Sequence, residues 1–163
     1  MGCPPPNLAT AGRANPLGIP YLYLSDSAKT TYFEVRAVYL DKLSVGRFYI
    51  PKSLSLVDFS YSINLYLSYV DGDTSLKEVV IKKMIIDSIS RDLSKPLRRY
   101  DSELEYVPTQ LICEFCKKYV QADGICFGSS LYCGGLNYVL FDHKAAKCIG
   151  VECHEITKID IDR

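Results

Sequence analysis

Apolar residues recur at helical spacing in the middle of the chain, where they form two adjacent rows with steps of four residues. The rows are Leu76, Val80 and Met84, then Ile81, Ile85 and Ile89. Such a wide apolar stripe predicts a helix over residues 75–92 that faces the core. The residue before a proline avoids the helical conformation, so Pro96 predicts that this helix ends near Ser94.

A second helical pattern begins at Pro108, a residue that is tolerated in the first turn of a helix. It predicts a helix over residues 108–120. The apolar side chains expected to point inward from it are Leu111, Ile112, Phe115 and Tyr119. A third, shorter helix is expected over residues 27–36, with one of the polar residues 25–27 as its cap.

Short β-prone runs lie before and after these helices. The expected strands are residues 19–24, 45–50, 54–59, 125–127, 137–141 and 155–161. Strands come first, helices occupy the middle and strands return, which favours an α+β fold over a regular alternation of strand and helix. Gly12 and Gly18 do not have the spacing of the phosphate-binding motif in dinucleotide-binding folds.

Composition and charge narrow the possible functions. The chain has 163 residues, 48% of them hydrophobic, which is enough for one core, so we expect a single domain over residues 1–163. The 19 Lys and Arg residues balance the 19 Asp and Glu residues, and a neutral chain offers no electrostatic case for direct nucleic-acid binding. The sequence has neither an apolar run long enough for a membrane nor a secretory signal, so we expect a soluble, cytoplasmic protein.

The seven cysteines raise the question of disulfides or a metal site. An odd number without a secretory signal argues against a disulfide framework. Cys113 and Cys116 have the spacing of half a zinc site, and the residues that could complete it are Cys126, Cys133 and His154. Structural zinc sites usually have a second close pair, and this pair lies in a predicted helix, so we expect packing thiols and no metal. No local pattern supports a catalytic cysteine beside a histidine.

Three sequence blocks, in order along the chain, carry a resemblance to a known family. They are GRANPLGIPYLYL at 12–24 with EVR at 34–36; Asp101, EYVPTQ at 105–110 and Glu114; and DGICFGSS at 123–130 with GGLN at 134–137 and LFD at 140–142. Together they resemble the RES domain, a family named for its arginine, glutamate and serine. The resemblance extends over residues 4–142, and the ordered set is much more specific than one block alone.

The resemblance implies an ADP-ribosyltransferase-like fold with mixed, mostly antiparallel sheets around a cleft. RES toxins split the nicotinamide–ribose bond of NAD⁺, which is their substrate and not a bound cofactor, with water or phosphate as acceptor. They are usually paired with a helical, DNA-binding antitoxin that blocks the active site. We therefore expect an NAD⁺ glycohydrolase or phosphorylase that acts as a bacterial toxin. Two alternatives stay open: transfer of ADP-ribose to a protein, and a catalytically silent module that binds a nucleotide or a partner.

Matching the motifs of the family assigns roles to individual residues. The matched positions are Arg13 for the arginine, Tyr23 for the tyrosine after it, Glu34 for the glutamate and Ser129 for the serine, with Ser130 if the alignment shifts by one. We expect these catalytic and NAD⁺-binding residues to line one cavity although they lie far apart in the sequence.

The chemistry of NAD⁺ cleavage suits these residue types. A guanidinium binds pyrophosphate oxygens in bidentate fashion, a task for Arg13. A carboxylate such as Glu34 stabilises the ribosyl cation that develops as nicotinamide leaves. Tyr23 can stack on a ring and offer its hydroxyl at the ring edge. Ser129 lies in a glycine-flanked turn that allows a close approach to nicotinamide or phosphate, but no base near it in the sequence supports a covalent nucleophile.

Two features depart from the pattern of the family. Longer members have an upstream strand with a further arginine before the segment that matches residues 2–6. We therefore expect an N-terminally shorter chain, which binds NAD⁺ more weakly if that arginine helps to hold it. Leu131 stands where a basic residue is common in the family, which weakens the expected phosphate contacts at that position.

Overall fold

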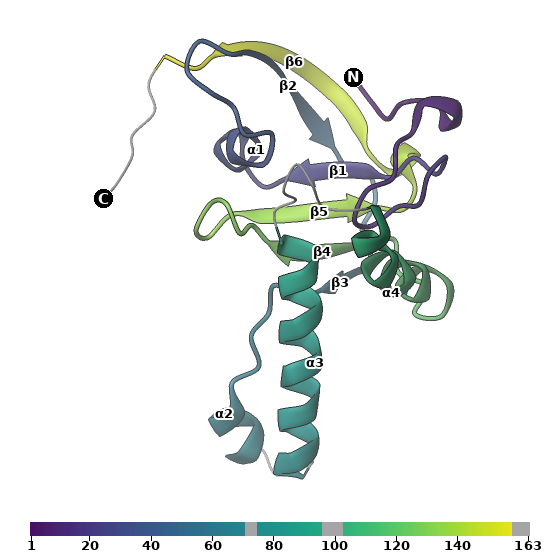
Figure 1. Cartoon of the computed structure of the whole chain (residues 1–163), viewed down its shortest axis with the longest axis vertical. Helices are drawn as coiled ribbons and strands as arrows, with labels where there is room; N and C mark the ends of the chain where they lie inside the picture. The colour runs from purple at the N-terminus through teal and green to yellow at the C-terminus, as the bar shows by residue number, and fades with distance from the viewer. Residues whose placement is uncertain (71–74, 96–102, 158–163) are drawn as a thin grey trace.

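The computed structural model describes residues 1–70, 75–95 and 103–157, and these residues contain two β-sheets (Figure 1). The larger sheet has the order β1 (Leu22–Ser25), β5 (Leu136–Leu140), β4 (Gly124–Gly128) and β3 (Leu56–Asp58). The smaller is a ribbon of β2 (Lys42–Tyr49) and β6 (Lys147–Glu155). Only β3 and β4 pair in parallel among the described strands, so the prediction of an α+β fold with mostly antiparallel sheets is confirmed.

All three predicted helices are present, and the residues at their starts explain where they begin. The predicted helices are α1 (Ala28–Glu34), α3 (Leu76–Ser94) and α4 (Val107–Lys118). The structure also has the short helix α2 (Leu65–Val70) and 3-10 turns at Pro6–Leu8, Glu103–Tyr106 and His143–Ala145. The Ser27 hydroxyl caps α1 by accepting from the Thr30 amide, and the Ser75 hydroxyl caps α3 by accepting from the Glu78 amide. The sequence pattern did not predict α2. No helix in the described ranges combines the length and apolar character that a membrane span requires.

The main core lies where α3 and α4 pack against β4 at the centre of the larger sheet. Ile125 of β4 and Val139 of β5 are fully buried, as are Leu93 of α3 and Cys113 of α4. Burial of such side chains is the dominant favourable contribution to folding. This core holds β5 in register with β1, whose residues 22–25 pair with residues 140–137. Tyr23 and Ser25 of β1 and Asn137 of β5 contribute side chains to the candidate site from these two strands.

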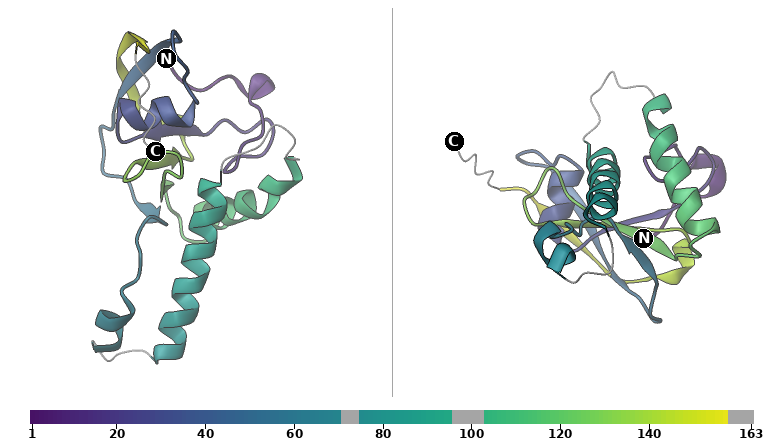
Figure 2. Two further views of the ribbon diagram at one scale, coloured as in Figure 1. Left: turned by 60° about the vertical axis from the view of Figure 1, so that its left-hand side comes forward. Right: turned by 90° about the horizontal axis from the view of Figure 1, so that it is seen from below.

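The predicted inward face of α3 is wrong for most of the helix. Met84, Ile85 and Ile81 are 66%, 53% and 46% exposed, and the buried side chains of α3 are Val79 and Leu93. The N-terminal part of α3 projects away from the sheet together with α2 as a two-helix arm (Figures 1 and 2). Because the C-terminal end of α3 alone reaches the sheet, most of the apolar stripe has no core to face within the described part of the chain.

The inward face of α4 also differs from the prediction. Leu111, Phe115 and Tyr119 are exposed, and Ile112 alone of the four expected side chains packs against the core. The buried side chains of α4 are Thr109, Cys113 and Cys116. These side chains are small, and small contact residues let a helix approach its neighbours closely. The larger apolar residues on either side of this row are therefore left at the surface.

Five of the six predicted strands are confirmed to within three residues at each end. The exception is the predicted strand over residues 155–161, because β6 ends at Glu155 and residues 158–161 lie outside the described ranges. The residues of β6 are mostly exposed, since among the described strands β6 pairs with β2 only, in a two-stranded ribbon. Ile149, Val151 and Cys153 alternate along β6 with Gly150, Glu152 and His154, but Ile149 and Val151 are 62% and 53% exposed, so here the alternation does not mark a half-buried strand.

Candidate functional site

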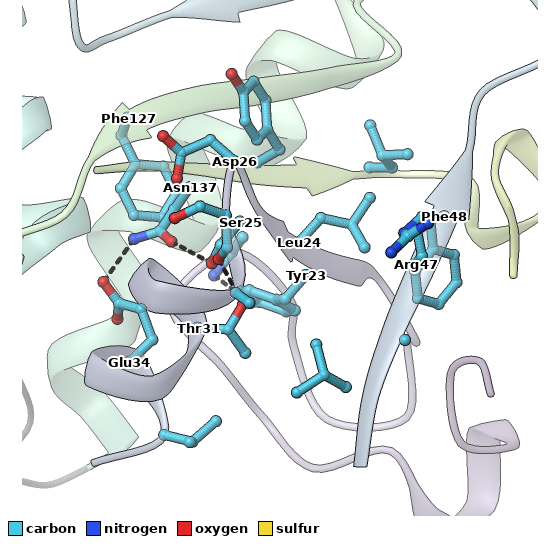
Figure 3. Close-up of a pocket in the computed structure, with 18 of the residues that line it drawn as sticks. Tyr23, Leu24, Ser25, Asp26, Thr31, Glu34, Arg47, Phe48, Phe127 and Asn137 are labelled. Atoms are coloured by element: carbon cyan, nitrogen blue, oxygen red, sulfur yellow. Dashed lines mark hydrogen bonds between the residues drawn. The ribbon is translucent and has the colours of Figure 1, made fainter. Parts of the chain in front are cut away.

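A pocket of about 820 Å³ lies between α1, β1 and the β2 strand of the ribbon (Figure 3). Arg13, Tyr23 and Glu34 all line this pocket, as the sequence predicted. Ser129 is absent from its wall but bonds directly to Glu34. A volume of this size falls in the range that holds small-molecule ligands and cofactors.

The carboxylate of Glu34 is held by two side chains from distant parts of the sequence. The Ser129 hydroxyl and the Asn137 amide each donate a 2.7 Å hydrogen bond to Oε1 of Glu34. Glu34 is the last residue of α1. The C-terminal end of a helix carries partial negative charge, which disfavours a carboxylate there. The two donors offset this unfavourable location and keep the carboxylate on the pocket wall.

Asn137 is a member of this site that sequence reasoning did not assign. Its side chain is 7% exposed, and its Oδ1 accepts a 2.9 Å hydrogen bond from the Ser25 hydroxyl on the neighbouring strand β1. The residue belongs to the GGLN motif, but the motif alone gave it no role. One feature of the sequence could have indicated its role: Asn137 is a polar residue in a strand whose other buried positions are Val139 and Leu140. A buried amide requires hydrogen-bond partners, so such a residue is expected to bond to other polar side chains.

The structure distinguishes the two candidate serines. The Ser129 hydroxyl donates to Glu34 and accepts from the backbone amides of Leu131, at 3.2 Å, and Tyr132, at 3.0 Å. The Ser130 hydroxyl instead donates to the carbonyl of Ser94 at the end of α3. Ser129 is thus the serine that faces Glu34, and its hydroxyl is engaged both by Glu34 and by the turn after β4.

Arg13 lies in a loop that α4 holds in place. The side chain of Thr109 donates to the carbonyl of Arg13 at 2.7 Å, and that of Gln110 donates to the carbonyls of Gly12 and Asn15 at 2.8 and 3.0 Å. The second motif block, at residues 105–110, therefore holds the loop of the first block in place through these hydrogen bonds. The Arg13 guanidinium donates a 2.6 Å hydrogen bond to the carbonyl of Leu93, and burial lowers its pKa.

Tyr23 presents its ring to the pocket while its hydroxyl is used within the protein. The hydroxyl donates to Oδ1 of Asn15 at 2.7 Å and accepts from the Ala14 amide at 3.1 Å. Burial raises the pKa of Tyr23 to about 12. A Cβ at Gly12 would lie 2.8 Å from this hydroxyl oxygen, so the close approach requires glycine. The hydroxyl that we expected to reach a ligand is thus engaged by Asn15 and Ala14, and Tyr23 also lines the pocket.

The wall opposite α1 is formed by β2. Val45, Arg47 and Phe48 line the pocket from this strand, and Figure 3 shows Arg47 and Phe48 across the pocket from Glu34. Arg47 forms an exposed 3.0 Å ion pair with Glu152 of β6. Exposed ion pairs contribute little stability, so this pair leaves the guanidinium able to exchange its partner for an anionic ligand.

The cysteine pair considered as half a zinc site lies in the core and not at the pocket. Cys113 and Cys116 are buried on α4, and burial raises the pKa of Cys113 to about 12. A raised pKa disfavours the thiolate form that binds metal. Residues 1–70, 75–95 and 103–157 contain no cluster of three His, Cys, Asp or Glu side chains arranged to hold a metal ion.

Comparison with known proteins adds one match. A family model described as RES domain matches residues 1–162, which is nearly the whole chain. No curated protein and no solved structure matches the chain, so the ADP-ribosyltransferase-like character of the fold stays a prediction.

Proposed function

The chain belongs to the RES domain family, and we propose that it degrades NAD⁺ by cleaving the bond between nicotinamide and ribose. This family is generally associated with NAD-utilising enzymes. The observation that carries the proposal is the Glu34 carboxylate on the pocket wall, with Arg13 and Tyr23 lining the same pocket. A carboxylate, a guanidinium and an aromatic ring match the cationic, anionic and ring-containing parts of NAD⁺.

In the proposed reaction the bond between C1′ of ribose and the ring nitrogen of nicotinamide breaks. Its electron pair leaves with nicotinamide, which becomes neutral, and positive charge develops on the ribose. The Glu34 carboxylate stabilises that charge from a fixed position, and preorganised charge of this kind is often the largest contribution to catalysis. Water or phosphate then forms the new bond to C1′. An attacking water loses a proton to solvent and gives ADP-ribose, whereas phosphate attacks through an ionised oxygen and gives ADP-ribose phosphate.

Arg13 has the role of binding the pyrophosphate. One nitrogen of its guanidinium bonds to the Leu93 carbonyl, which sets the direction of the side chain. The remaining N–H groups can make charge-assisted bonds to phosphate oxygens. Burial lowers the pKa of Arg13, but a guanidinium begins from so high a value that it stays charged near neutral pH.

Tyr23 and Ser129 have supporting roles in the proposal. The ring of Tyr23 packs against a ring of the substrate, and the bonds of its hydroxyl to Asn15 and Ala14 fix the ring orientation. Ser129 orients Glu34 and is not a nucleophile, because its hydroxyl proton is directed at Glu34 and its oxygen accepts two backbone amides. Ser130 has no assigned role in catalysis, since it bonds to Ser94.

The proposed biological role is that of a bacterial toxin neutralised by a protein antitoxin. Consumption of NAD⁺ would arrest growth, and a partner that covers the pocket would prevent it. This role rests on the family and on the proposed activity together. Expression from a tightly controlled promoter, with growth and cellular NAD⁺ measured in parallel, tests it directly.

Product identification tests the proposed reaction. The purified chain is incubated with NAD⁺ with and without phosphate, and the products are separated by chromatography and mass spectrometry. We expect nicotinamide together with ADP-ribose, or with ADP-ribose phosphate when phosphate is the acceptor. Label that accumulates on protein would instead indicate an ADP-ribosyltransferase, and unchanged NAD⁺ would indicate a silent binding module.

A further inference from the structure

Asn137 joins three elements of the pocket through one buried side chain. It lies on β5, its Nδ2 donates to Glu34 at the end of α1, and its Oδ1 accepts from Ser25 on β1 (Figure 3). The side chain also lines the pocket. A buried amide whose donor and acceptor ends are both engaged has one favoured orientation.

The chemistry of the two partners determines which way the amide points. The ionised Glu34 carboxylate can only accept hydrogen bonds, whereas the Ser25 hydroxyl can donate or accept. The amide nitrogen of Asn137 must therefore face Glu34, and its oxygen must face Ser25. Both contacts, 2.7 Å to Glu34 and 2.9 Å to Ser25, lie within hydrogen-bonding distance.

The two donors to Glu34 meet the same oxygen. Ser129 and Asn137 both bond to Oε1, and within the described ranges no donor bonds to Oε2. Two bonds from different directions restrict rotation of the carboxyl group about its terminal torsion, which is otherwise broad. The carboxylate is thereby held with one oxygen engaged by the protein and the other left for a ligand.

We propose that Asn137 is a positioning residue that fixes the orientation of the Glu34 carboxylate in the pocket, with Ser25 holding the amide in place. The proposal rests on the proposed function for its catalytic consequence. Asn137 acts through Glu34, so its loss affects the step that needs an oriented carboxylate more than substrate binding. A misplacement of a catalytic group by about 1 Å can reduce the rate about 100-fold.

A double-mutant cycle with Glu34 tests this dependence. We expect Asn137→Ala to lower kcat for NAD⁺ cleavage about 10–100-fold with little change in KM, and Ser25→Ala to lower it less. In the Glu34→Gln background, Asn137→Ala should cause little further loss, because the carboxylate it positions is gone. An equal loss of kcat in both backgrounds would overturn the proposal.

A matched control separates positioning from a general loss of stability. Val79 is buried on α3 in the projecting arm and lies outside the pocket. Val79→Ala should lower the midpoint of thermal unfolding while kcat of the folded protein stays unchanged. If Val79→Ala and Asn137→Ala reduce kcat to the same extent, the effect of Asn137 is structural and the proposal is wrong.

A measurement that needs no turnover keeps the inference testable if the proposed function fails. In ¹⁵N-labelled protein the side-chain amide signals of Asn137 are assigned by their loss in Asn137→Ala. We expect Glu34→Gln to shift these signals and Val79→Ala to leave them in place. Unchanged Asn137 signals in Glu34→Gln would show that the amide does not hold Glu34. Absence of NAD⁺ cleavage by the unmodified chain would instead refute the proposed function.

Discussion

The hydroxyl of Ser129 donates a 2.7 Å hydrogen bond to Oε1 of Glu34, a residue 95 positions earlier in the chain. This contact joins the turn after β4 to the last residue of α1 and brings two separate motif residues to one point. The same carboxylate oxygen accepts from Asn137. The serine and the glutamate therefore form one unit, in which the serine orients the carboxylate and the carboxylate faces the pocket.

The contrast between the two adjacent serines gives the first prediction. Ser129→Ala removes one of two donors to Glu34 and the cap of the following turn, so we expect kcat to fall about tenfold or more, as for loss of a hydrogen bond to a charged group. Ser130→Ala, whose hydroxyl bonds to the Ser94 carbonyl, should change kcat by less than about twofold. Steady-state NAD⁺ cleavage by both variants measures the difference. Equal losses in the two variants would contradict the assignment.

Arg13 should affect binding more than turnover. The pyrophosphate charge is present in both substrate and transition state, so Arg13→Ala is expected to raise KM for NAD⁺ about 10–100-fold with a smaller change in kcat. Arg13→Lys should restore only part of the affinity, because an ammonium lacks the planar fork of donors. Titration of ADP-ribose by calorimetry checks the binding effect independently. Full recovery in Arg13→Lys would argue against bidentate binding.

The position of the Tyr23 hydroxyl depends on the absence of a side chain at Gly12. A Cβ there would lie 2.6 Å from Oδ1 of Asn15 and 2.8 Å from the Tyr23 oxygen, so Gly12→Ala must change both contacts. We expect a loss of about 1–3 kcal/mol in the free energy of unfolding, with weaker NAD⁺ binding. Gly150→Ala is the matched control, because a Cβ at Gly150 meets nothing within 4 Å. Equal stability of the two variants in denaturant would contradict this account.

Buried groups with raised pKa values predict a loss of stability at alkaline pH. Burial raises the pKa of Cys113 from 9.0 to about 12, so between these values the folded chain keeps a proton that the unfolded chain releases. The unfolded state then binds fewer protons, and the free energy of unfolding falls as pH rises through this window. Cys113→Ala should be less stable at pH 8 but should lose less stability by about pH 10.5. Parallel pH curves for the two proteins in urea titrations would refute the link to Cys113.

The sequence predicted which residues line the pocket better than it predicted the hydrogen bonds that hold them there. Arg13, Tyr23 and Glu34 followed from motifs, and all three line the pocket. The roles of Asn137 and Gln110 did not follow, because their importance lies in hydrogen bonds to residues about 100 positions away. Residue type alone does not reveal such partners.

The errors in the helices have a different physical origin. Periodicity reveals that a helix has an apolar stripe, but it does not reveal whether the chain supplies a surface to cover that stripe. The exposed Met84 and Ile85 on the projecting arm are an example. On α4 the small residues Cys113 and Cys116 face the core while the larger Phe115 is exposed, so size was a poor guide to burial.

The most direct test of the central claim is the rate of NAD⁺ cleavage by Glu34→Gln. Glutamine keeps the size of the side chain but removes the negative charge. The control is Glu78→Gln, an exposed carboxylate at the start of α3 that lies outside the pocket. With both variants shown to be folded, we predict that Glu34→Gln lowers kcat about 10²–10³-fold, as expected for one well-placed electrostatic group, while Glu78→Gln cleaves NAD⁺ at the unmodified rate. A kcat for Glu34→Gln within about twofold of the unmodified protein would contradict the role of the Glu34 charge.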